Sequence, residues 1–131
     1  MPYTITYNPE TGFVEAKVQG TISFNEIKEI YAKYVQTTME NESFLYLADY
    51  REATLDLSTM ELYDLPKILS DIAAPLGINV HKLRRAVVIA KGLKSRQLRD
   101  YGFYETVTLN RGQNTKLFED MDEAKKWLSR K

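Results

Sequence analysis

The chain has 131 residues, of which 44% are hydrophobic and 27% are charged, and this composition excludes a disordered, collagen-like or coiled-coil chain. Its 18 Lys and Arg residues balance its 18 Asp and Glu residues, so no net field attracts nucleic acid, anionic lipid or acidic substrates. The absence of cysteine excludes disulfides, thiolate catalysis, iron–sulfur clusters and cysteine-ligated zinc.

One domain and no membrane segment are expected. The length is close to the most common domain size, so we predict a single domain over residues 1–131. No window reaches the roughly 18 apolar residues that cross a bilayer, and residues 1–5 lack a basic leader. We therefore expect a cytoplasmic protein that is neither exported by a standard signal nor integral to a membrane.

The first elements in chain order are a hairpin and a helix. Residues typical of strands occupy 3–7 and 13–18, and the turn residues 8–12 lie between them. Gly20 is expected to close the second strand. The pattern at 23–26 is a capping box, and the apolar residues that follow recur at helical spacing. These patterns predict a β-hairpin followed by an amphipathic helix.

A buried strand and a second helix come next. The apolar run 44–48, which ends at Asp49, predicts a strand buried on both faces and followed by a polar turn. A second capping box at 58–61 begins an apolar helical pattern that stops near Gly77. Pro66 lies within this pattern, so we expect either a kink or a short helix that restarts.

The rest of the chain repeats the alternation of strand and helix. Residues 85–90 predict a buried strand, and a helix is expected from about Ser95. Residues 106–109 either continue this helix or form an extended segment, and we favour the helix. A last strand at 115–119 precedes a terminal helix capped by Asp120. The order ββαβαβαβα predicts an α/β fold with a mixed, mostly parallel five-stranded sheet and about four helices.

Two segments carry a resemblance to a known family. Ala-Asp-Tyr-Arg-Glu-Ala-Thr at 48–54 resembles the central strand end of the SpoIIAA-like proteins of the STAS superfamily. Leu-Phe-Glu-Asp-Met-Asp-Glu-Ala-Lys-Lys-Trp-Leu at 117–128 is similar to the last strand and helix of the same group. The resemblance covers nearly the whole chain, and it implies a non-enzymatic, bacterial regulatory or ligand-binding domain.

The resemblance also implies two modes of action. Anti-sigma-factor antagonists of this superfamily carry a phosphorylatable hydroxyl in Asp-Ser-Ser-Gly after the central strand, and Leu57-Ser58-Thr59-Met60 occupies that place here. Ser58 and Thr59 are therefore candidate phospho-acceptors of a switch that docks a protein partner, although Leu57 and Met60 depart from the motif. Relatives that resemble the lipid-binding SEC14 fold imply the alternative, a small amphipathic molecule held between helix 58–76 and the sheet.

The candidate binding surface lies where the parallel strands end, because loops and helix N-termini converge at that edge of an open α/β sheet. In one interpretation, an anion is held there by Arg51, Lys94 or Arg96 together with free helix amides. In the alternative interpretation, Ser58 only caps its helix and the charges stay solvated. The residues predicted to form this surface are Asp49, Arg51, Ser58, Thr59, Lys94 and Arg96.

No pattern in the sequence indicates catalysis, a metal or a cofactor. His81 is the only histidine, so zinc and Ser-His-Asp chemistry lack partners. Gly92 stands alone where a phosphate loop needs two glycines. The basic residues within 82–99 are divided by a strand, so nucleic acid is not an expected partner. The less clearly inward Tyr63 and the pair Tyr101 and Tyr104 are assigned to the core or surface, with a pocket or homodimer contact as alternatives.

Overall fold

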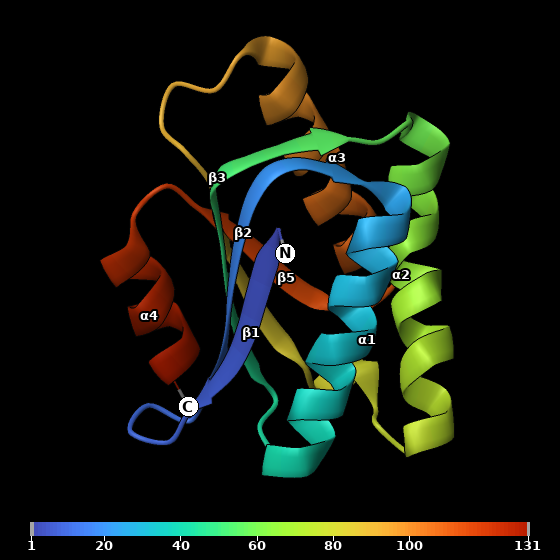
Figure 1. Cartoon of the computed structure of the whole chain (residues 1–131), viewed down its shortest axis with the longest axis vertical. Helices are drawn as coiled ribbons and strands as arrows, with labels where there is room; N and C mark the ends of the chain where they lie inside the picture. The colour runs from blue at the N-terminus through green and yellow to red at the C-terminus, as the bar shows by residue number, and fades with distance from the viewer. Residues whose placement is uncertain (1, 131) are drawn as a thin grey trace.

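The computed structural model describes residues 2–130, which form one five-stranded sheet and four α-helices (Figure 1). The strands are β1 (Tyr3–Asn8), β2 (Phe13–Ser23), β3 (Leu45–Asp56), β4 (Arg84–Val88) and β5 (Asn114–Phe118). The helices are α1 (Phe24–Asn41), α2 (Thr59–Ala73), α3 (Ser95–Asn110) and α4 (Met121–Ser129), with 3-10 turns η1 (Ala74–Leu76) and η2 (Val80–Lys82). The predicted α/β fold is confirmed.

The strand order explains where the helices lie. The strands follow one another across the sheet in chain order, with β1 antiparallel to β2 and the other neighbours parallel. Parallel crossovers share one handedness, so three crossovers that advance in the same direction place α1, α2 and α3 on the same face. Of the helices within residues 2–130, α4, which follows the last strand, is the one that covers the other face (Figure 1).

The side chains of the sheet alternate between two cores. On β4, Arg85 and Val87 point towards α1, α2 and α3, whereas Ala86 and Val88 point towards α4. The larger core contains most of the buried tyrosines, and the smaller one is built around Leu128 of α4. The charged Arg85 therefore lies on the face of the sheet that three helices cover.

Local sequence signals define the ends of the first two helices. Ser23 caps α1 and Ser58 caps α2, each in a complete capping box with the glutamate three residues later. Helix α2 is continuous from Thr59 to Ala73, so the predicted restart at Pro66 does not occur. A helix tolerates proline here because only one hydrogen bond is lost and tertiary packing holds both flanking turns. Pro66 itself is buried.

The strand predicted at 44–48 is much longer in the structure, where it runs from Leu45 to Asp56. The prediction was too short because the residues of a β-bulge resemble a turn in the sequence. Lys17 of β2 pairs with Asp49 of β3, and Gln19 pairs with Glu52, so β3 holds one extra residue. The bulge shifts the alternation of buried side chains, and the strand continues to Asp56. Asp49 is therefore inside β3, and the prediction that it ends the strand was wrong.

Strand β2 also extends beyond its predicted end. Gly20 has a φ of 82° and pairs with Ala53 within the sheet, so it does not close the strand. A left-handed backbone of this kind favours glycine, and it lies next to the bulge on β3. Strand β2 therefore runs directly to Ser23, the N-cap of α1, and β3 ends at Asp56, two residues before Ser58, the N-cap of α2.

Candidate functional site

The structure places Asp49 and Arg51 together, on the side of the sheet that faces α4. Arg51 donates from Nε and Nη2 to the two carboxylate oxygens of Asp49, each at 2.9 Å. This pairing lowers the pKa of Asp49 below its ordinary value. Met121 and Lys125 of α4 line the same hollow, so Asp49 and Arg51 lie away from α2.

The structure places Ser58, Thr59 and Arg96 in a second region, near the N-terminus of α2. The Ser58 hydroxyl accepts from the Glu61 backbone N–H at 3.1 Å, and the Glu61 carboxylate accepts from the Ser58 N–H at 2.8 Å. Ser58 and Arg96 line one shallow hollow, and Thr59 is exposed beside it. Lys94 is the exposed N-cap of α3 and makes no side-chain capping bond. Of the residues predicted to form one surface, two pairs therefore line separate hollows, and Thr59 and Lys94 are exposed outside them.

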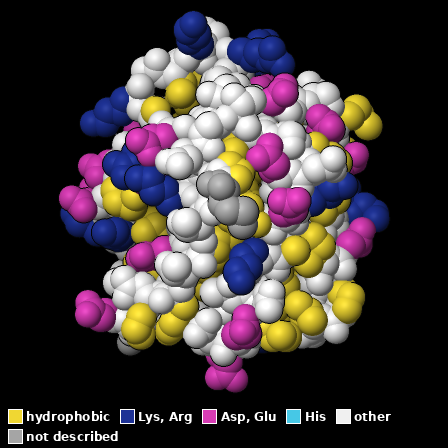
Figure 2. Space-filling model, viewed as in Figure 1, with side chains coloured by type: hydrophobic (Ala, Val, Ile, Leu, Met, Phe, Trp, Pro, Cys, Tyr) yellow, Lys and Arg dark blue, Asp and Glu magenta, His cyan; other side chains and the backbone are white. Residues whose placement is uncertain are grey.

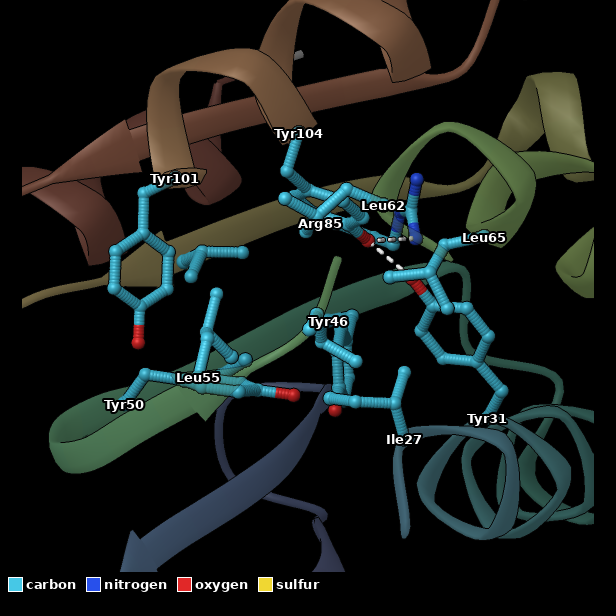
Figure 3. A pocket seen from close by; sticks show the side chains of 13 residues that line it. Ile27, Tyr31, Tyr46, Tyr50, Leu55, Leu62, Leu65, Arg85, Tyr101 and Tyr104 are labelled. Atoms are coloured by element: carbon cyan, nitrogen blue, oxygen red, sulfur yellow. Dashed lines mark hydrogen bonds between the residues drawn. The ribbon is translucent and has the colours of Figure 1, made fainter. Parts of the chain in front are cut away.

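Beneath α2 lies a cavity that we call the tyrosine–arginine cavity (Figure 3). Helices α1, α2 and α3 and the inner face of β3 and β4 enclose it, and its volume is about 30 Å³. That volume is room for about one or two water molecules. Its apolar wall consists of Ile27, Ala48, Leu55, Leu57, Leu62, Leu65 and Val87. Its polar groups are Tyr31, Tyr46, Tyr50, Tyr101, Tyr104 and Arg85.

Arg85 is the one charged residue in the lining of this cavity, as far as residues 2–130 describe it. Its side chain comes from β4 and is 1% exposed. The guanidinium donates from Nη1 to the Tyr104 hydroxyl at 3.0 Å and from Nη2 to the Gln113 Oε1 at 2.9 Å. Tyr104 in turn shares a hydrogen bond with the Tyr31 hydroxyl, which Figure 3 shows as a chain of dashed lines. The buried cation therefore has neutral partners.

Gln113 connects Arg85 to the middle of α2. Its side chain, in the turn before β5, is fully buried. The amide Nε2 donates to the Pro66 carbonyl at 2.8 Å and to the Ser70 hydroxyl at 3.2 Å. A single amide thus joins the cation on β4 to the helix turn that contains the proline.

Three tyrosine hydroxyls of the cavity, those of Tyr31, Tyr46 and Tyr50, stay protonated at neutral pH. Burial raises the pKa of Tyr31, Tyr46 and Tyr50 well above its ordinary value, because a phenolate loses its hydration there. The hydroxyls of Tyr46 and Tyr101 are buried and have no hydrogen-bond partner among residues 2–130. Tyr50 and Tyr101 meet edge to face at the end of the cavity opposite Arg85 and Tyr31 (Figure 3). Unpaired buried donors are rare, so these hydroxyls are available to an occupant.

The sequence analysis missed Arg85 as a site residue, although a signal existed. Period-two alternation in the strand places Arg85 on the same side as Val87 and Ile89, which are plainly apolar positions. An arginine at a position that alternates with buried residues is expected to have its charged side chain removed from water. Of the tyrosines left open above, Tyr101 and Tyr104 line the cavity, whereas Tyr63 is exposed on α2.

The arrangement is suited to binding. The cavity lining holds no carboxylate, histidine or serine within residues 2–130, so it contains no pair of a nucleophile and a base. No group of three or more potential metal ligands occurs among the same residues. Figure 2 shows basic and acidic side chains interspersed on the face seen in Figure 1, without a large patch of one sign. Within residues 2–130, no helix has both the length and the apolar character needed to cross a bilayer.

Comparison with known proteins gives the fold. No family model and no curated protein matches the sequence. The structure is similar to an uncharacterised protein of the DUF3478 family with a SpoIIAA-like fold from Shewanella loihica PV-4, with a TM-score of 0.58 and 18% identity over 96% of this chain and 91% of that one. It also matches the phosphorylated Bacillus cell fate determinant SpoIIAA, with a TM-score of 0.48 and 10% identity over 95% of this chain and 98% of that one. The chain has a SpoIIAA-like fold, as the sequence resemblance implied.

Proposed function

We propose that the chain is a non-enzymatic regulatory domain that binds a small amphipathic molecule in the tyrosine–arginine cavity. The observation that supports this proposal most directly is the cavity, which has an apolar wall and two buried tyrosine hydroxyls with no hydrogen-bond partner among residues 2–130. Ligand sites in proteins are typically concave and mostly apolar, with a few polar groups that orient the ligand. The cavity has room for about one or two water molecules, so a larger ligand requires α2 to move outward against the contacts of Gln113 with Pro66 and Ser70.

Native mass spectrometry of freshly purified protein tests this proposal. We expect a fraction of the protein to carry a non-covalent adduct that is lost on denaturation. Ala48→Leu extends a larger side chain from β3 into the cavity, and we expect it to abolish the adduct. Leu47→Met is the matched control, because Leu47 faces the opposite core and the substitution conserves volume.

Two outcomes would count against the proposal. One is wild-type protein that has only its bare mass and gains no adduct when incubated with amphipathic molecules. The other is an adduct that persists unchanged in a folded Ala48→Leu variant. Circular dichroism melting of both variants establishes that they are folded, since overpacking a core costs about 1–3 kcal/mol.

A protein-interaction switch at Ser58 or Thr59 is a second candidate function. Both hydroxyls are exposed at the first turn of α2, and Arg96 lines the hollow beside Ser58. A phosphoryl group adds about −1.5 to −2 charges, and it would compete with Glu61 for the helix N-terminus. The change would alter the surface that a protein partner meets.

Mass spectrometry of the protein from its native host tests the switch. A phosphopeptide that contains phosphorylated Ser58 or Thr59 supports the switch. Detection of the peptide that contains both residues, always in its unmodified form under all growth conditions, counts against it. Thr106 is a suitable comparison residue, because it is an exposed hydroxyl residue on α3, away from the hollow of Ser58 and Arg96.

A further inference from the structure

Arg85 is a buried cation that has no counter-charge among residues 2–130. Its side chain is 1% exposed, and the ion pairs formed within residues 2–130 do not include it. Its two hydrogen-bond acceptors, on Tyr104 and Gln113, are neutral. An ion taken out of water without a partner carries an effective penalty of several kcal/mol, which is why buried charges are normally paired. The missing component of this site is an anion.

We infer that the ligand is a small amphipathic monocarboxylate whose head group binds Arg85 inside the cavity, an inference that rests on the proposed ligand-binding function. One buried cation balances one negative charge, so a monoanion fits better than a dianionic phosphate. A guanidinium has five N–H donors, and within residues 2–130 two of them donate to Tyr104 and Gln113. The planar fork of arginine matches a carboxylate with two parallel hydrogen bonds.

The rest of the cavity determines how the ligand lies. With its carboxylate on Arg85, the apolar part of the ligand contacts the leucines of α2, Leu62 and Leu65. The cations Arg51 and Lys94, which the sequence suggested as anion-binding residues, are exposed and do not line the cavity. The head therefore points inward and the apolar part lies beneath α2. This orientation is the reverse of a lipid whose head stays in water.

The neighbouring Arg84 provides an internal comparison. Its guanidinium donates to the carbonyls of Trp127, Leu128 and Arg130 at the end of α4, and it lies over the Trp127 ring. Arg84 thus has three backbone carbonyl acceptors and a side chain that is partly exposed to solvent. Arg85, one residue later on the same strand, has two acceptors and is 1% exposed. The contrast separates an arginine that holds the fold from one that is available to a ligand.

Calorimetric titration with matched acids and amides tests the inference. The probes are butyrate, hexanoate and benzoate, each compared with its primary amide, which is isosteric and neutral. We expect at least one acid to bind about tenfold tighter than its amide, since charge-assisted hydrogen bonds are roughly twice as strong as neutral ones. Arg85→Met should abolish this preference, and Arg84→Met, the matched control, should retain it.

A second variant and a stability measurement keep the test decisive. Gln113→Glu places a carboxylate beside Arg85, and we expect it to weaken acid binding without weakening amide binding. Arg85→Met removes the desolvation penalty of a buried charge but also the hydrogen bonds to Tyr104 and Gln113, so if Arg85 is a ligand group the unliganded variant should have a stability close to that of wild type. A strong loss of stability in Arg85→Met together with unchanged acid preference in Gln113→Glu would overturn the inference.

The outcomes separate this inference from the proposed function. Equal binding of each acid and its amide overturns the monocarboxylate assignment and leaves an amphipathic-ligand site in place. Retention of the acid preference in Arg85→Met assigns the head group elsewhere and also overturns the inference. Absence of binding by every acid and every amide overturns the inference and the proposed function together.

Discussion

Replacing Gln113 with leucine removes three hydrogen bonds from the buried contact between β4 and α2. The Gln113 amide accepts from Arg85 and donates to the Pro66 carbonyl and the Ser70 hydroxyl. Leucine has a similar volume and is apolar, so the substitution tests the polar contacts with little change in packing. The guanidinium of Arg85 would retain one neutral partner, the Tyr104 hydroxyl.

The expected magnitude follows from the partners. A hydrogen bond from a charged donor contributes about 1.5–3 kcal/mol, and a neutral one contributes about 0.5–1.5 kcal/mol. The Pro66 carbonyl still accepts from Ser70 at 3.2 Å, so it is not left without a donor. We therefore expect Gln113→Leu to lower the free energy of unfolding by about 3 kcal/mol.

Urea unfolding followed by circular dichroism measures this loss. With a slope of about 2 kcal/mol per molar urea, the midpoint should fall by about 1.5 M. Ser70→Ala is the control, because it leaves Gln113 bonded to Arg85 and Pro66, and it should cost less than about 1 kcal/mol. A loss below about 1 kcal/mol in Gln113→Leu would refute the idea that this amide anchors α2.

Three further predictions concern the fold around the cavity. Five buried tyrosines, Tyr31, Tyr34, Tyr46, Tyr50 and Tyr101, have a pKa raised by burial. As the pH rises, these tyrosines therefore lose their protons in the unfolded chain before they do so in the folded protein. The free energy of unfolding should be unaffected below about pH 10 and should fall as the pH rises further, and urea midpoints measured on either side of that pH test this. Ser58→Ala should cost about 1 kcal/mol of unfolding free energy by removing the α2 cap, whereas Thr59→Ala should be nearly neutral; equal effects would contradict the capping role. Arg84→Met should speed amide exchange in the last turn of α4, because the terminal carbonyls lose their donor, and unchanged exchange would argue against that contact.

Much of the fold was predictable because its signals are local. The capping boxes at Ser23 and Ser58 satisfy the first amides of α1 and α2 with groups three residues away. The apolar periodicity that predicts each helix likewise operates within a few turns. Strand β3 was predicted too short because the exposed pair Arg51 and Glu52 resembles a turn, although it belongs to a bulge in a continuing strand.

The candidate site was less predictable because it depends on contacts between distant positions. Asp49 and Ser58 are nine residues apart in the sequence, yet they line separate hollows. In the cavity, by contrast, residues that are far apart in the sequence are in contact. Arg85 meets Tyr104 and Gln113, which are 19 and 28 positions away, and Tyr104 meets Tyr31 across 73 positions.

The sequence by itself determined that this is an α/β domain with a mixed sheet, since strand and helix patterns and their caps are properties of short segments. It also specified that an arginine would stand in register with the buried side of β4. Only the tertiary structure decided what surrounds that arginine. The packing of α1, α2 and α3 on one face surrounds Arg85 with neutral tyrosines and an amide. No carboxylate of residues 2–130 bonds to the Arg85 guanidinium. That juxtaposition depends on the crossover topology and the register between strands, neither of which a local pattern encodes.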